Sequence, residues 1–199
     1  MAFRPQNKLQ GAFVLDCRNL SERDLLTKWV FRSTPYGFRR SSEEFSAWRQ
    51  ALAECLDVEP TSIFVVGSTA AGLSLSPTKR LRPHNPTSDV DVAIVSEQAF
   101  RTAWDWFVTQ RIERIGLPAP VRDWVDAHKE SYIFFRQIAS DQYMEYLPFG
   151  RQWLLCLEAA SRQSPCTGRS VKARIYQDQD ALMHYIASGI HNLRAQLGI

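Results

Sequence analysis

Two short segments, residues 63–68 (IFVVGS) and 88–92 (SDVDV), decide the fold of this 199-residue chain. The first is an apolar run that ends at Gly67, which predicts a buried strand followed by a turn. The second alternates acidic and apolar residues, which predicts another strand. Because side chains two residues apart in a strand point to the same face, Asp89 and Asp91 are expected to lie side by side.

Segments before and after this pair of strands have the apolar spacing of helices. Apolar residues recur at helical spacing in several segments, and Ser41 or Ser42 can cap the first of them. Helices are expected at 42–56, 97–110, 121–138, 151–162 and 179–197, and a further strand at 171–176. This order predicts a mixed α/β (α+β) fold, with a small mixed sheet flanked by helices and a helical C-terminal part.

The chain divides into an N-terminal part and one main domain. Residues 1–40 are expected to form an irregular extension with a short helix at 21–31, and residues 41–199 the domain. Within the domain, 62–95 is the core motif, 97–164 the helical part, and 171–197 the last strand and helix. Core candidates on the later helices are Trp104, Phe107, Val108, Trp124, Val125, Phe134, Ile138, Trp153, Leu154 and Leu157.

Composition excludes several classes of protein. The net charge of +3 is too small by itself to demand nucleic acid as a partner. No long apolar run and no leader-like N-terminus is present, so we expect a cytoplasmic protein without a membrane span. The cysteines are widely scattered, which predicts neither a zinc site nor a disulfide framework.

A basic segment separates the two motif halves. Residues 75–88 contain three prolines together with Lys79, Arg80, Arg82 and His84. We expect an exposed loop there, either simply solvated or close to a bound triphosphate or nucleic acid. Lys79 is the nucleotide-binding candidate of this loop.

The two motif halves have complementary chemistry. A strand that delivers Gly67 and Ser68 to the start of a helix can present backbone N–H groups and a hydroxyl to phosphate oxygens. Two adjacent carboxylates, Asp89 and Asp91, suit Mg²⁺, which favours oxygen ligands and binds substrate phosphates. Together they predict a site for a metal-bound nucleotide.

An apolar strand, Gly-Ser and then Asp-x-Asp on a strand resembles the nucleotidyltransferase superfamily typified by DNA polymerase beta and kanamycin nucleotidyltransferase. The resemblance covers residues 62–95. It implies that Gly67 and Ser68 bind phosphate, and that Asp89 and Asp91 are catalytic and hold Mg²⁺ or Mn²⁺. It also implies transfer of a nucleoside monophosphate from an NTP to an RNA 3′ end, a protein side chain or a small molecule, as in bacterial toxin–antitoxin or phage-defence systems.

The chain departs from that family at the third carboxylate. The strand expected to carry it, 171–176, has Lys172, Arg174 and Tyr176 on one face and no acid. The acids that could replace it are Asp141, Glu145, Asp178 and Asp180. The alternative is a catalytically silent protein of this fold that binds nucleotide, RNA or a partner protein. An acid beside Asp89 and Asp91 favours the enzyme, whereas Lys172 or Arg174 there favours binding.

Overall fold

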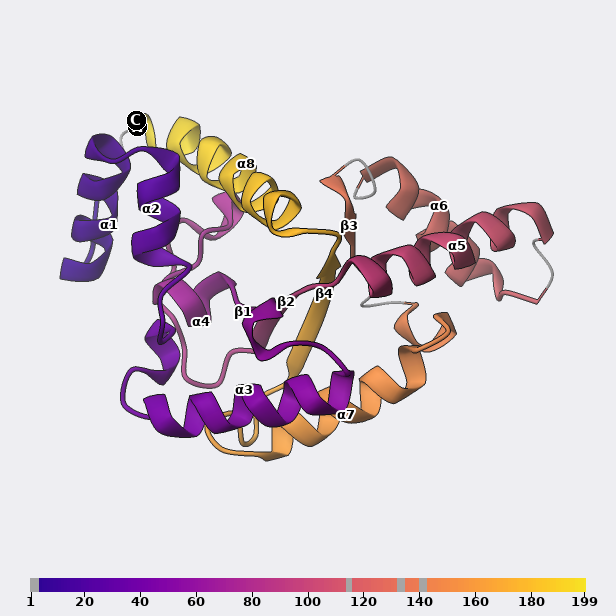
Figure 1. Ribbon diagram of the computed structural model, residues 1–199. Coiled ribbons are helices and arrows are strands. Elements are labelled where there is room, and N and C mark those ends of the chain that lie inside the picture. The colour runs from indigo at the N-terminus through magenta and orange to yellow at the C-terminus, as the bar shows by residue number, and fades with distance from the viewer. Residues whose placement is uncertain (1–3, 114–115, 132–134, 140–142) are drawn as a thin grey trace.

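The computed structural model describes residues 4–113, 116–131, 135–139 and 143–199 of the chain (Figure 1). Within these ranges, helices surround one four-stranded sheet that contains both parallel and antiparallel pairs. This arrangement confirms the mixed α/β class expected from the sequence.

The sheet has the strand order β1-β2-β4-β3. β1 is antiparallel to β2, β2 is parallel to β4, and β3 is antiparallel to β4. The parallel register places Asp91 beside Lys172 and Ala93 beside Arg174. The strands are β1 (Ile63–Val65), β2 (Val90–Val95), β3 (Gln137–Ile138) and β4 (Val171–Tyr176).

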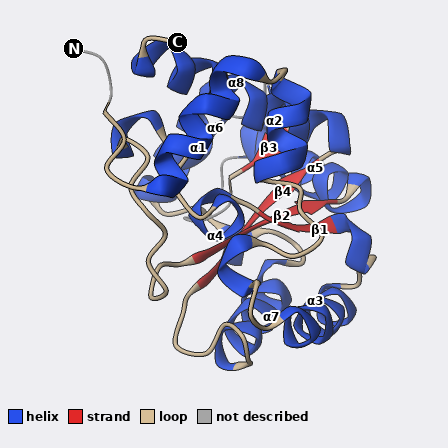
Figure 2. Ribbon diagram, turned by 90° about the vertical axis from the view of Figure 1, so that its left-hand side faces the viewer, coloured by secondary structure: helices blue, strands red, loops and turns tan. Residues whose placement is uncertain are grey.

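Helices cover both faces of the sheet (Figure 2). One face carries α8, against which α2 packs; the other carries α3 and α7, which pack against each other. The helix pair α5 and α6 extends from one end of the sheet (Figure 1). The long helices are α1 (Lys8–Asn19), α2 (Glu22–Trp29), α3 (Ser42–Leu56), α5 (Glu97–Glu113), α6 (Ala119–Ser131), α7 (Gly150–Arg162) and α8 (Gln179–Leu197).

Short helices connect these elements. The turn after β1 is the helix α4, which is only five residues long. The short segments are α4 (Gly67–Ala71), η1 (Tyr36–Phe38), η2 (Pro60–Ser62), η3 (Pro77–Lys79) and η5 (Met144–Tyr146). No helix in the described ranges is long and apolar enough to span a bilayer.

Side chains alternate between the two faces of the sheet along each strand, so each face contributes to a different part of the core. Val90 and Ile94 of β2 belong to the large buried cluster that includes residues of α3 and α7. Ala93 and Tyr176 instead pack against Leu182 of α8 in a smaller cluster. The face under α8 therefore also carries Asp91, which is two residues before Ala93 in the same strand.

Residues 4–40 contain more helix than expected. The expectation of an irregular segment is wrong for Lys8–Asn19, which forms α1. Asn7 caps this helix by accepting the backbone N–H of Gln10, and Phe13 and Cys17 are buried on one face. The expected helix at 21–31 is present as α2, capped by Ser21. Both helices pack into the main core.

Other expectations need correction. The helix expected over 121–138 ends at Ser131, and Ile138 lies in the strand β3. Trp104, Val108, Trp124 and Leu154 were expected in the core but are 39–44% exposed. The loop expected to be exposed at 75–88 buries Leu81 completely. Its His84 is half-buried, and burial lowers the pKa of this imidazole. Phe134 lies outside the described residues.

A disulfide joins the two helices on the far face of the sheet. Cys55 of α3 and Cys156 of α7 are bonded although they are 101 residues apart. The sequence predicted no disulfide framework, and this single bond was not anticipated, because distance along the chain does not reveal that α3 and α7 are neighbours. The indole N–H of Trp48 also joins these helices by donating to the carbonyl of Ala160, at 2.9 Å.

A buried histidine makes stability depend on pH. His128 of α6 is 3% exposed and stacks on Phe107. Its pKa is lowered to about 4, mainly by burial and to a smaller extent by the charge of Arg174, while a backbone hydrogen bond with Gln137 opposes the shift.

Acidification is therefore expected to destabilise the fold through His128. An unfolded histidine has a pKa near 6.5, so this contribution is fully present above pH 6.5 and is lost as the pH falls toward 4. Each pH unit in this window is expected to lower the free energy of unfolding by up to about 1.4 kcal/mol. Urea titrations between pH 7 and 5 measure the slope. An equal slope in a folded His128→Phe variant would contradict this assignment.

Candidate functional site

A pocket of about 530 Å³ lies between the sheet and α8. Its walls come from β2, β4, α8 and the segment after α4. The volume is in the range of small-molecule sites. The lining residues that bear on chemistry are Gly67, Asp91, Lys172, Arg174, Tyr176 and Tyr185. The fold thus brings Gly67 and Asp91 together with two cations of β4.

Gly67 allows the backbone to turn sharply at the edge of this pocket. It has a φ of +64°, a conformation that glycine adopts without steric cost. A methyl group at this position would lie 3.0 Å from Oδ2 of Asp91. The backbone N–H of Val66 donates to the carbonyl of Asp91 at 2.9 Å, which extends the pairing of β1 with β2. Glycine therefore permits the close approach of the Asp91 carboxylate to the turn.

Lys172 neutralises the first aspartate. Its ammonium group donates to Oδ2 of Asp89 at 2.6 Å. Both side chains are about half exposed, 50% for Lys172 and 46% for Asp89. An ion pair this exposed contributes little to folding stability, so it bears mainly on the charge of the site.

The other end of the pocket is aromatic. The guanidinium of Arg174 donates to the hydroxyl of Tyr185 at 2.9 Å. The ring of Tyr185 lies 5.9 Å from that of Tyr176 and 6.1 Å from that of Phe135, between ring centroids. All three aromatic residues line the pocket. Arg174 therefore marks the boundary between a charged end and an aromatic end.

Arg169 holds the segment before β2 in place. Its buried guanidinium donates to the carbonyl of Ser88 at 2.7 Å and to the hydroxyl of Thr69 at 2.7 Å. The same group lies over the ring of Phe38. Burial lowers the pKa of Arg169, which the charges of Asp89 and Asp91 oppose. Arg169 thus connects the start of β2 to α4.

The other candidates from the sequence lie at different places. Ser68 is half-buried in α4, Lys79 is exposed in η3, and neither lines the pocket. Asp89 lies just before β2 and reaches the pocket through its contact with Lys172. A helix as short as α4 has a weak dipole, so the phosphate role of Gly67 and Ser68 stays a prediction.

The acids considered as a third carboxylate are engaged or exposed. Asp178 caps α8 by accepting the N–H of Ala181 at 2.7 Å and pairs with Arg136 at 2.6 Å. Asp180 is exposed in the first turn of α8, and Glu145 is exposed in η5. Asp141 lies outside the described residues.

The donor set around Asp89 does not fit a resident Mg²⁺. In the part of the chain that the structure describes, no three His, Cys, Asp or Glu side chains gather in a group that could hold a metal ion. Asp89 and Asp91 offer carboxylate oxygens, but the Lys172 ammonium already occupies an oxygen of Asp89. A cation beside a metal site repels the metal.

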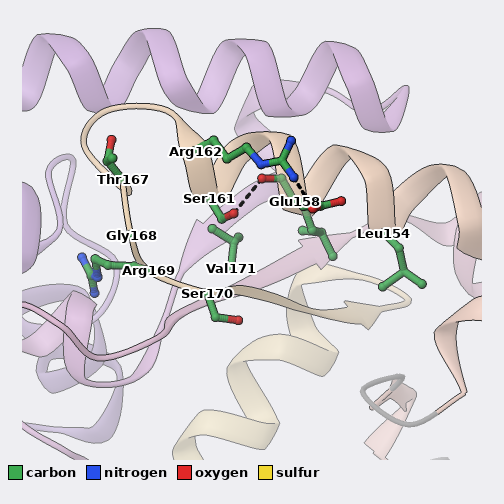
Figure 3. A pocket seen from close by; sticks show the side chains of 10 residues that line it. Leu154, Glu158, Ser161, Arg162, Thr167, Gly168, Arg169, Ser170 and Val171 are labelled. Carbon is green, nitrogen blue, oxygen red and sulfur yellow. Dashed lines mark hydrogen bonds and ion pairs between the residues drawn. The ribbon is translucent and has the colours of Figure 1, made fainter.

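A second, larger cavity of about 590 Å³ lies beside α7 (Figure 3). Glu158 and Arg162 on its wall form an ion pair with each other, and Ser161 donates to the Glu158 carbonyl. The guanidinium of Arg169 makes its hydrogen bonds to Ser88 and Thr69 instead. Each of these three charged groups therefore has a partner within the chain, and the motif residues Gly67 and Asp91 line the pocket under α8 instead.

Comparison of the chain with protein-family models, with curated proteins and with solved structures finds no match to any of them. The assignment of the site therefore rests on its own geometry.

Proposed function

We propose that the chain is a nucleotide-binding protein of the nucleotidyltransferase type and that the pocket under α8 holds the nucleotide. The observation that carries the proposal is the division of this pocket into a charged and an aromatic end. Lys172 supplies a cation at one end, Tyr185 supplies a ring at the other above the buried Tyr176, and Arg174 lies between them. Phosphates and a nucleobase require this combination of partners.

Binding of the phosphates is expected to depend on two cationic side chains of β4. Arg174 can donate in a planar fork to phosphate oxygens, and Lys172 adds a second positive charge two residues away. Asp91 borders the same space and would repel an anionic ligand. The two cations offset this negative charge. Gly67 adds backbone to the wall of the same pocket.

The fold agrees with this proposal. The Gly-Ser turn follows β1, the two aspartates occur at the start of β2, and the sheet is mixed and flanked by helices. In the position where the resemblance implies a third carboxylate, β4 carries Lys172 paired with Asp89. This arrangement favours binding without transfer over the enzyme.

Transfer of a nucleoside monophosphate is the second candidate. The observation in its favour is that Asp91 lies in the same pocket as the cations, beside Gly67. Incubation with each α-³²P-labelled NTP, with total RNA and cell lysate as acceptors, separates the two candidates. We expect binding without label transfer. Label on RNA or protein that disappears with Asp91→Asn would establish the enzyme instead.

Neutralising the cations is expected to weaken nucleotide binding. A hydrogen bond to a charged group is worth about 1.5–3 kcal/mol, so Arg174→Gln should raise Kd for the preferred NTP about tenfold or more. Lys172→Gln should also raise Kd, because it leaves the negative charge of Asp89 unbalanced beside the phosphates. Calorimetric titration with ATP, CTP, GTP and UTP measures the change. Arg151→Gln, on α7 across the sheet, is the matched control and should bind as the wild type does.

The same titrations can contradict the proposal. Absence of binding with all four NTPs, with and without Mg²⁺, would exclude a nucleotide site. Equal losses in Arg151→Gln and Lys172→Gln would show a general effect of net charge. A loss confined to Lys79→Gln would place the ligand at the exposed end of η3, outside the pocket.

A further inference from the structure

The ion pair between Lys172 and Asp89 gives the site an unusual charge balance. Two carboxylates, Asp89 and Asp91, face two cations, Lys172 and Arg174, so the four charges sum to zero. The parallel register of β2 with β4 places Lys172 beside Asp91, and its ammonium reaches Asp89 at 2.6 Å. One lysine thereby contributes charge to both acids.

A divalent cation would have to occupy the same position. Mg²⁺ and Mn²⁺ bind through carboxylate oxygens, and Asp89 and Asp91 are the acids available at this place. An ammonium in contact with Asp89 competes for its oxygen and repels a nearby doubly charged ion twice as strongly as it repels a single charge. The backbone pairing of β2 with β4 holds the base of Lys172 at this position in the sheet.

We propose that the ammonium of Lys172 takes the place of a divalent cation at the Asp89–Asp91 pair, so that nucleotide binds to this pocket without Mg²⁺. The inference rests on the proposed nucleotide site and specifies its ionic requirement. In this arrangement Lys172 screens Asp89 from the ligand phosphates, and Arg174 contacts those phosphates at the boundary with the aromatic end.

Metal binding without nucleotide provides the first test. Electron paramagnetic resonance of Mn²⁺ measures the ratio of free to bound metal, and it is applied to the wild type, Lys172→Gln and Lys172→Arg. We expect Lys172→Gln to bind Mn²⁺ at least tenfold more tightly than the wild type, because the competing charge is gone. Lys172→Arg keeps the charge and should behave as the wild type. Adding Asp89→Asn to Lys172→Gln should abolish the increase in Mn²⁺ affinity.

Each other outcome overturns the inference. Equal Mn²⁺ affinity in wild type and Lys172→Gln would show that Lys172 does not compete with the metal, and so would absence of binding in both proteins. Circular dichroism establishes that each variant is folded, and Lys172→Arg provides a second folded comparison.

Nucleotide titration in EDTA provides the second test. We expect the preferred NTP to bind the wild type with similar Kd in EDTA and in excess Mg²⁺. Binding only with Mg²⁺ would overturn this inference and leave the nucleotide site intact. Absence of binding under both conditions would overturn the proposed function as well, so the two failures are distinguishable.

Discussion

Gly150→Ala is expected to lower the free energy of unfolding by about 3 kcal/mol or more, because the first turn of α7 has no room for a side chain. A methyl group at Gly150 would lie 1.5 Å from the carbonyl oxygen of Met144, which is a backbone atom. Relief of this overlap requires η5 to separate from α7. Urea denaturation measures the loss, and a melting temperature lower by roughly 10 °C should accompany it.

Gly11→Ala is the matched control for this variant. Gly11 also lies in a helix, α1, but a methyl group there would meet only the Cβ atom of Pro5 at 4.0 Å. Alanine should stabilise this helix by about 0.5–1 kcal/mol, because glycine loses more backbone freedom on folding. Equal stability of Gly150→Ala and the wild type would show that η5 does not pack on α7 in this way.

Reduction of the disulfide between Cys55 and Cys156 is expected to lower the free energy of unfolding by about 3 kcal/mol. The bond closes a long loop, since its cysteines are 101 residues apart, and so it restricts the unfolded chain strongly. The melting temperature should fall by roughly 10 °C in reducing agent. Nucleotide binding should persist, because the disulfide joins α3 and α7, on the face of the sheet away from the pocket.

The double variant Cys55→Ser and Cys156→Ser is the control for reduction. It should melt at the temperature of the reduced wild type and be insensitive to the reducing agent. The remaining cysteines, Cys17 and Cys166, are buried, and burial raises the pKa of both thiols. Titration of four thiols in unfolded protein that was never reduced would contradict the bond.

The disulfide also bears on the compartment. Disulfides persist mainly in oxidising environments and are rare in the cytosol. The cytoplasmic location expected from the sequence stays a prediction, and the thiol titration of freshly isolated protein addresses it directly.

Strong local patterns predicted most of the fold. The helices α3 and α8 and the strands β2 and β4 occur where the apolar periodicity predicted them, although the side chain of Ser41 makes no capping hydrogen bond at the start of α3. Elements with weak local signals were missed. β3 has only two residues, so pairing with β4 defines it and no pattern in its own sequence does. The sequence did not predict α1, because the polar residue Gln10 interrupts its apolar face. In the structure Gln10 is buried, and its side-chain amide donates to the Leu81 carbonyl.

The candidate site was predictable in part. The motif located Gly67 and Asp91, and the alternation along β4 indicated that Lys172 and Arg174 would share a face. The contact of Lys172 with Asp89 depends on the parallel register of two strands about 80 residues apart, which local patterns do not contain. The aromatic end could not be predicted for a similar reason, because the ring of Tyr185 meets those of Tyr176 and Phe135 only in the folded chain.

Hydrogen exchange measured by mass spectrometry, with and without the preferred NTP, tests the central claim most directly. If the pocket under α8 binds nucleotide, exchange should slow in β4, in the turn at Gly67 and in α8 around Tyr185, while α3 and α7 on the other face of the sheet remain unchanged. Protection confined to α3 or α7, or no protection at saturating NTP, would contradict the account.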